Sequence, residues 1–345
     1  MFLSRRVFLA SLGALGLSGC RKAEPRVVLY CAQDREFALG VLETFRERFG
    51  LEVVPKFDTE KNKSVGLYTE LVAEKDRPRC DVFWNNEIVS TIRLQRQGLL
   101  EGYKSPSGED YPAWAKADDH TWHAFASRAR ILIVNTDRAK EMPASLLDLA
   151  DPRWKGEAVM ARPQFGTTAT QMACLFDVLG RQQAEDYLRR LKANDVQLAP
   201  GNKQVAEWVA RGKTPSGKPV SVGVTDTDDA IDEVKAGKPV RIVFPDRAAD
   251  GRMGTLFIPN TLCILKGCPD PEGAKKLVDY LLSAEVEKRL AEGPSAQIPL
   301  NPKVTATLPA QIETPANLTV MRVDWAKAAD SWDDAQTFVT NLFAG

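Results

Sequence analysis

The chain of 345 residues is long enough for two domains of ordinary size, and its composition excludes several classes of protein. It carries 46 basic and 46 acidic side chains, so its formal charge at pH 7 is zero. A nucleic-acid-binding protein usually presents a basic face, which this balance does not favour. Beyond residue 20, no segment approaches the roughly 20 apolar residues that span a bilayer. We therefore expect no nucleic-acid partner and no membrane-spanning helix.

The first twenty residues predict export from the cytoplasm. They combine a twin-arginine start, Ser4-Arg5-Arg6-Val7-Phe8-Leu9, with a short apolar stretch and the tetrapeptide Leu17-Ser18-Gly19-Cys20. About twelve apolar residues are too few to span a bilayer, so we interpret residues 1–19 as a signal peptide. The tetrapeptide resembles a bacterial lipoprotein box. That resemblance implies cleavage before Cys20, lipidation of its thiol, and a protein anchored at the periplasmic or extracellular face of a membrane. Export would use the twin-arginine route or the general secretion path.

The mature chain would keep 326 residues, with 46 acidic side chains against 44 basic ones. Besides Cys20 it holds five cysteines, an odd number for an oxidising compartment, so at least one should stay unpaired. Cys263 and Cys268 are the expected disulfide, because Cys263 lies in an apolar run and Cys268 follows the Lys266-Gly267 turn. No C-x-x-C spacing supports a zinc site.

Short apolar runs alternate with helical patterns along the mature chain, the rhythm of a parallel sheet between layers of helices. In the first part we expect strands at 27–30, 51–57 and 81–84, and helices at 35–49, 64–74 and 87–97. Further strands are expected at 130–135, 158–161 and 220–224. Later helices should begin near Thr167, cover 202–211, and form one long helix over 270–291, with Pro271 suited to its first turn.

Four landmarks then occur in a characteristic order: Leu29-Tyr30-Cys31-Ala32-Gln33-Asp34, Asp81-Val82-Phe83-Trp84 followed by Asn85-Asn86-Glu87, Ser127-Arg128-Ala129-Arg130, and Gly254-Thr255-Leu256-Phe257-Ile258-Pro259-Asn260-Thr261. Together they resemble the extracellular solute-binding proteins of ABC importers, in the ferric-ion-binding branch. The resemblance implies a type II periplasmic-binding-protein fold of two α/β lobes. Crossing strands are expected near 124–130 and 244–254, with a ligand cleft at the hinge.

The implied lobes divide the chain unevenly. Lobe 1 is expected to be discontinuous, with residues 20–126 plus 250–345, and lobe 2 to hold residues 127–249. Such a protein binds a solute and delivers it to an ABC permease in the inner membrane. We expect it to act as a monomer, without a cofactor and without catalysis.

The start of the helix near Thr167 has the chemistry of an anion site. Gly166, Thr167 and Thr168 bring free backbone N–H groups, the positive end of a helix dipole and two hydroxyls together. Asn202, at the start of the next helix, matches the family position that helps to hold the same anion, and Arg128 is a third candidate. Each has a structural alternative: the threonines and Asn202 as helix N-caps, and Arg128 as the partner of a surface carboxylate.

An acidic group follows the strand at 220–224. Thr225-Asp226-Thr227-Asp228-Asp229 places three carboxylates within four residues, where they repel one another unless a cation or a donor-rich partner compensates them. This pattern favours a hard cation or an ammonium group. The alternative is a helix N-terminus stabilised by its own acidic residues.

The chain departs from the ferric pattern at the metal ligands. Ferric binders of this branch usually present adjacent tyrosines, a histidine near the first strand and a glutamate after the second motif. Here Asp228 and its neighbours stand in place of the tyrosines, Asp34 in place of the histidine, and Asn86-Glu87 in the glutamate region. The expected metal ligands are therefore Asp34, Glu87, Asp226 and Asp228, since carboxylates are hard ligands that can hold Fe(III).

Two kinds of cargo follow from these residues. The first is ferric ion with phosphate or carbonate as a synergistic anion. The second is an amine-bearing or phosphorylated organic solute, such as an aminophosphonate or a polyamine. Its cation would face Asp34, Glu87 and Asp228, with Trp84 available for stacking unless that indole belongs to the core.

An exported enzyme that works in a cleft is the alternative of another class. The sequence contains no G-x-S-x-G, H-E-x-x-H or P-loop motif, and His120 and His123 flank Trp122 on an expected strand, where a structural role is favoured. A structural adaptor that binds no ligand is a further alternative.

Overall fold

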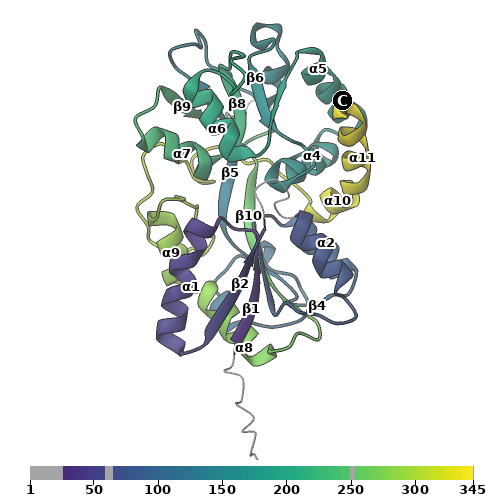
Figure 1. Cartoon of the computed structure of the whole chain (residues 1–345), viewed down its shortest axis with the longest axis vertical. Coiled ribbons are helices and arrows are strands. Elements are labelled where there is room, and N and C mark those ends of the chain that lie inside the picture. Colours follow the sequence, from purple (N-terminus) through teal and green to yellow (C-terminus); the bar gives the residue numbers. More distant parts are fainter. Residues whose placement is uncertain (1–25, 59–64, 249–252, 345) are drawn as a thin grey trace, which may run out of the picture.

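The structure of the protein is a computed structural model that describes residues 26–58, 65–248 and 253–344. The expected signal peptide and the lipidation site at Cys20 lie outside the described residues. Figure 1 shows an elongated molecule of two α/β lobes, one above the other, joined at the waist by strands β5 (His123–Asn135) and β10 (Phe257–Leu265). Within the described ranges, no helix combines the length and the apolar character needed to cross a membrane.

The lower lobe in Figure 1 contains a parallel sheet built from the first part of the chain. Strand β1 pairs in parallel with β2 on one side and with β3 on the other, as the alternation of strands and helices predicts. Helix α1 ends at Phe49, and Gly50 caps it with a φ of 61°, the left-handed conformation that commonly closes a helix. The elements are β1 (Arg26–Cys31), α1 (Arg35–Phe49), β2 (Glu52–Phe57), α2 (Val65–Ala73), β3 (Val82–Asn85), α3 (Val89–Arg96) and β4 (Leu100–Glu101).

Strand β5 passes through both lobes. All 13 of its residues are buried. Its first half pairs antiparallel with β10, and its second half pairs antiparallel with β8 (Val222–Asp226) and β9 (Val240–Val243). The expected crossing at 124–130 and the expected strand at 130–135 are therefore one element. The return connection leaves β9 and enters β10, where Leu256 accepts a hydrogen bond from the Arg130 backbone.

The upper lobe repeats the parallel arrangement with its own strands. Strand β6 pairs in parallel with β7 and β8. The main strand order is β2-β1-β3-β10-β5-β8-β6-β7, with β4 paired to β10 and β9 paired to β5 beside this path. Apolar side chains are buried on both faces of this sheet, under helices on each side. The remaining elements are β6 (Ala158–Ala161), α4 (Gly166–Val178), α5 (Arg181–Ala193), β7 (Gln197–Ala199), α6 (Asn202–Arg211) and α7 (Thr227–Lys235), with 3₁₀ turns at Pro106–Gly108, Ala113–Ala115, Leu146–Ala150 and Pro152–Trp154.

The expected long helix over 270–291 is wrong as a single element. The chain forms α8 (Pro271–Leu281) and α9 (Ala284–Glu292), separated by Leu282 and Ser283. The Ser283 side chain accepts a hydrogen bond from the Val286 backbone and so caps a new helix. The apolar period continues across the break, and for that reason the sequence pattern conceals it.

The last two helices associate the end of the chain with the upper lobe. Helix α10 (Trp325–Asp330) packs against α3 and α4, and α11 (Trp332–Phe343) packs against α4 and α5. The rings of Phe338 and Phe176 lie 6.2 Å apart, and Figure 1 shows both helices beside α4. The lobe boundaries stay a prediction; α11 packs against α4 and α5, which lie in the expected lobe 2, while Trp332 and Asp333 at its start contact Arg93 of α3.

The expected Cys263–Cys268 disulfide is also wrong. Both thiols are free, as are those of Cys80 and Cys174. The Cys263 thiol is buried between strands, with its sulfur 3.9 Å from the carbonyl oxygen of Phe83 in β3. Burial raises the pKa of Cys263, and burial raises the pKa of Cys268 to about 11, so both remain protonated thiols at neutral pH.

Candidate ligand-binding site

Two arginines of β5 contact residues at the ends of strands from both lobes. Arg128 and Arg130 are two positions apart on a strand, so their side chains leave the same face. Arg128 contacts segments that follow β1, β3 and β8, whereas Arg130 contacts segments that follow β6 and β7 and the last residue of β8. In open α/β sheets, ligands bind beyond the carboxyl ends of the strands, which is where these contacts converge.

Arg130 is fully buried and forms the centre of a hydrogen-bonded network in the upper lobe. Its guanidinium donates to Asp226 Oδ1 at 2.9 Å, Asn202 Oδ1 at 3.0 Å, Gln171 Oε1 at 3.1 Å, Thr168 Oγ1 at 3.2 Å and Thr167 Oγ1 at 3.3 Å. Asp226 Oδ2 accepts in turn from Thr167 Oγ1 at 2.5 Å and from Asn202 Nδ2 at 2.9 Å. The sequence assigned Thr167, Thr168 and Asn202 to an anion site and Asp226 to a separate acidic group for a cation, whereas the structure joins all four side chains in one network.

Helices α4, α6 and α7 all begin at this network, and none has a side-chain cap. Their N-cap residues are Phe165, Gly201 and Asp226, and no side chain of the three accepts a capping hydrogen bond. The structure therefore does not use Thr167, Thr168 or Asn202 as N-caps. Since the first N–H groups of a helix have no intrahelical partner, three positive helix ends face the same small region.

Gly166 allows the tight entry into α4. Its φ of 57° lies in the left-handed region, which side chains rarely adopt, and a Cβ atom there would meet no other atom within 4 Å. Backbone strain rather than lack of space is therefore the reason for a glycine. The residue is buried at the first position of the helix.

Arg128 connects the two lobes. Its Nε lies 3.1 Å from Asp228 Oδ2, its Nη1 donates to the Asn86 carbonyl at 3.1 Å, and its Nη2 donates to Gln33 Oε1 at 2.7 Å and to Asn260 Oδ1 at 3.0 Å. Burial lowers the pKa of Arg128, but the nearby aspartates, Asp228 first, outweigh it and raise that pKa. The guanidinium is thus a fixed positive charge at the hinge. The expected surface partner is instead a buried carboxylate.

The carboxylate of Glu87 lies in the lower lobe at the end of β3 and is fully buried. It accepts hydrogen bonds from Asn85 Nδ2 at 2.9 Å, the Ser90 backbone at 3.1 Å and Thr170 Oγ1 at 2.8 Å. Thr170 belongs to α4 of the upper lobe, so this last bond spans the two lobes. The bond requires the lobes to be close together.

A second contact between the lobes involves an ammonium group. Lys203, in the first turn of α6, donates to Glu36 Oε1 in the first turn of α1 at 3.2 Å. Partial burial lowers the pKa of Lys203, but its hydrogen bond to Glu36 and the charges of Glu36, Asp229 and Asp34 outweigh burial and raise that pKa. The carboxylates at this edge therefore already surround one protonated amine.

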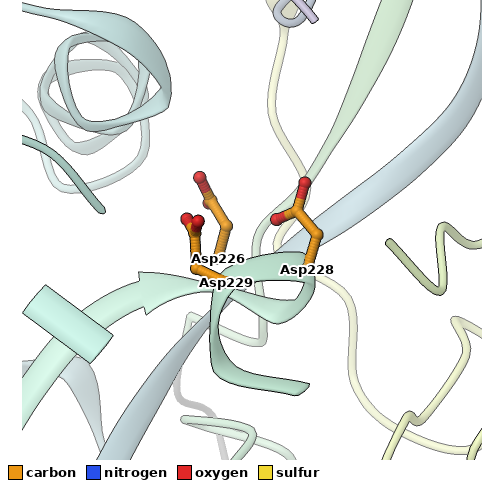
Figure 2. Close-up of side chains that lie close together, drawn as sticks. All are labelled: Asp226, Asp228 and Asp229. Atoms are coloured by element: carbon orange, nitrogen blue, oxygen red, sulfur yellow. The ribbon is translucent and has the colours of Figure 1, made fainter. Parts of the chain in front are cut away.

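Figure 2 shows the acidic group at the end of β8 and the first turn of α7. Asp226, Asp228 and Asp229 each place a carboxylate oxygen within 4.8 Å of the others, a spacing that could hold a metal ion. Asp226 is paired with Arg130, however, and Asp228 with Arg128. The Glu87 carboxylate, which was also expected to bind metal, already accepts hydrogen bonds from three donors where the two lobes meet. A metal ion would have to displace buried arginines from these aspartates.

Three of the expected residues have structural roles. Trp84 is fully buried, with its ring 5.4 Å from that of Phe125, so it belongs to the core rather than to a surface that could stack on a cation. Thr225 Oγ1 donates to the Asn202 carbonyl at 2.9 Å. Thr227 Oγ1 accepts from the Ala129 backbone at 3.2 Å. Thr225 thus joins β8 to α6, and Thr227 joins the start of α7 to β5.

Sequence reasoning missed four residues of this region: Gln33, Arg130, Thr170 and Lys203. Arg130 could have been found, because the two-residue period of a strand places it beside Arg128. Gln33 is 2% exposed, and its Nε2 group makes no hydrogen bond to any described residue. A buried amide donor without a partner calls for an acceptor such as a ligand or a water molecule.

The arrangement of two lobes, with helix starts and charged side chains converging between them, is that of a receptor that closes on a small molecule. Solved structures confirm the fold. The periplasmic binding protein AfuA from Actinobacillus pleuropneumoniae, with fructose-6-phosphate bound, superposes with a TM-score of 0.80 at 24% identity, over 92% of this chain and 98% of that one. Iron-bound HitA from Pseudomonas aeruginosa gives 0.79 at 23% identity, over 91% and 99%. This is the type II periplasmic-binding-protein fold.

Sequence relatives cover most of the chain. An uncharacterized protein of Haemophilus influenzae is 30% identical over 94% of this chain and 92% of its own length. The major ferric iron-binding protein of Neisseria meningitidis is 25% identical over 86% and 87%. A protein of Salmonella typhi named "Putative 2-aminoethylphosphonate-binding periplasmic protein" is 28% identical over 66% and 65%.

The family of bacterial extracellular solute-binding proteins matches residues 87–329, and the chain belongs to it. The family and the fold are those of solute-binding proteins and not of enzymes, which decides against the exported enzyme considered from the sequence.

Proposed function

We propose that this solute-binding protein serves an ABC importer and that its cargo is a small organic solute with an oxyanion at one end and an ammonium group at the other, such as an aminophosphonate. One observation carries the proposal: α4, α6 and α7 begin without side-chain caps around the network of Arg130 and Asp226. The first-turn N–H groups of α4 and α6 and the positive dipoles of all three helices suit an oxyanion.

The opposite end of such a solute has a counterpart as well. Glu36, Asp229 and Asp34 act together on the Lys203 ammonium at the edge of the junction. A second amine would be stabilised by the same carboxylates. The relative from Salmonella typhi carries an aminophosphonate in its name, which supports this cargo class.

Ferric ion with a synergistic anion is the second candidate. The close spacing of Asp226, Asp228 and Asp229 favours it, as does the name of the relative from Neisseria meningitidis. The same helix starts would hold the phosphate or carbonate. Against it stand the ion pairs of Asp226 and Asp228 with buried arginines, which the metal would have to break.

A thermal-shift and calorimetry panel separates these candidates. A ligand at 100 times its Kd should stabilise the protein by about 2.7 kcal/mol. We expect 2-aminoethylphosphonate to do so, ethylphosphonate to bind less tightly because it lacks the amine, and Fe(III) with phosphate or carbonate to leave no metal on the protein after gel filtration. Asp195→Asn, an exposed change at Lys155, is the matched control. Stabilisation by iron alone, with metal retained, would replace this proposal by the second candidate.

We further propose that Cys20 anchors the protein by a lipid on the outer side of a membrane. Cys20→Ala should then move the protein from the membrane fraction to the soluble fraction, because the only thiol placed for lipidation is gone. Ligand affinity should stay unchanged. Fractionation of cells followed by immunoblotting measures the first effect, and calorimetry the second. A variant that stays in the membrane fraction with its signal cleaved elsewhere would contradict the anchor.

A further inference from the structure

The anion-binding region contains a carboxylate of its own. Asp226 is 4% exposed. Its Oδ2 accepts a hydrogen bond from Thr167 Oγ1, in the first turn of α4, at 2.5 Å. The same oxygen accepts from Asn202 Nδ2 at 2.9 Å at the start of α6. An oxyanion that binds the free N–H groups of these two helices would therefore touch Asp226.

A carboxylate at this position restricts which oxyanions fit. Ionised, it is an acceptor only, with about four lone-pair positions on its two oxygens. The hydrogen bonds from Thr167, Asn202 and Arg130 use three of these positions. Oδ1 can therefore accept one more hydrogen bond. Asp226 Oδ1 is ion-paired with Arg130 Nη1 at 2.9 Å. A fully ionised oxyanion beside it would place two negative charges in contact.

We infer that Asp226 is a specificity-determining residue that accepts a hydrogen bond from the ligand and so selects oxyanions that carry a proton. The inference rests on the proposed function. A phosphonate or phosphate-ester monoanion keeps one O–H group, which donates to Asp226, while its other oxygens accept from the N–H groups of α4. The second pKa of a phosphoryl group is about 6, so the proton is available near neutral pH. Sulfonates and sulfate esters have no such proton.

The sharpest test compares two solutes on the unmodified protein. 2-Aminoethylphosphonate and 2-aminoethylsulfonate share the amine and the carbon chain and differ in the proton that the acid group can carry. Calorimetry should give at least a 100-fold tighter Kd for the phosphonate. Equal affinities would overturn the role of Asp226 and leave the proposed function standing. Failure of both solutes to bind would overturn the proposed function itself.

A second measurement also needs no variant. At pH 8 a free phosphonate is mostly the dianion, so binding as the monoanion must take up close to one proton. Calorimetry in buffers of different ionisation enthalpy counts that proton, and the sulfonate should give none. Binding of the phosphonate without proton uptake would contradict the inference.

Substitution locates the effect at Asp226. Asp226→Asn can donate an N–H group to a fully ionised oxyanion, so the preference for phosphonate over sulfonate should fall at least tenfold. Glu207→Gln, on the exposed side of α6 in an ion pair with Arg211, should keep the preference of the parent. Circular dichroism verifies that both variants fold. A folded Asp226→Asn protein with unchanged preference would assign the selectivity to another residue.

Discussion

Replacement of Arg130 by methionine should lower the free energy of unfolding by about 3 to 5 kcal/mol, the cost of breaking a buried ion pair by removing one partner. Arg130 is fully buried and donates to side chains on α4, α6 and β8. Methionine fills much of the same volume, but it leaves Asp226 as a buried charge without its counter-ion. Urea unfolding followed by circular dichroism measures the loss.

Two further variants make that result specific. The double variant Arg130→Met with Asp226→Asn should recover a large part of the loss, because it removes the stranded charge as well. Arg211→Met, which breaks an exposed ion pair with Glu207, should cost at most about 1 kcal/mol. If Arg130→Met cost no more than Arg211→Met, the network would not be the structural centre of the upper lobe.

Replacement of Thr170 by valine should weaken the binding of every ligand by about 10- to 100-fold and leave the stability of the fold nearly unchanged. The Thr170 hydroxyl donates to the buried Glu87 carboxylate across the two lobes at 2.8 Å. A hydrogen bond to a charged group contributes about 1.5 to 3 kcal/mol, and each 1.4 kcal/mol is tenfold in affinity. Because water can replace that bond when the lobes open, its loss penalises the closed state alone.

The effect of Thr170→Val should be uniform across ligands, unlike that of a residue that touches one of them. Calorimetry with several ligands and small-angle scattering without ligand are the measurements, and scattering should report a larger open population. Thr69→Val is the matched control, since the exposed Thr69 side chain donates its hydroxyl to the Val65 carbonyl within α2 and lies outside the contact between the lobes. A loss of affinity confined to one ligand would indicate direct contact with that ligand instead of control of closure.

Local hydrophobic patterns in the sequence correctly predicted the helices and strands that bury one continuous apolar face. The expected bounds of α1, β6 and α6 agree with the structure, because each element has one apolar stripe or one apolar run with clear ends. The pattern failed where the apolar period runs on through a backbone break, as it does at Leu282 and Ser283 between α8 and α9. It also assigned the Cys263–Cys268 pair from an apolar run followed by a turn, whereas strand pairing directs the Cys263 thiol toward β3.

By itself the sequence determined which chemical groups follow the strands: the helix starts at Gly166 and Asn202, the acidic group after β8, and Glu87 after β3. It could not determine how they are paired. Arg130 and Asp226 are 96 positions apart, and Thr170 and Glu87 are 83 apart. Only the antiparallel pairing of β5 with β8 and the closure of the lobes bring those groups into contact. Burial then makes each charge depend on its partner, because a group removed from water must find its donors within the protein.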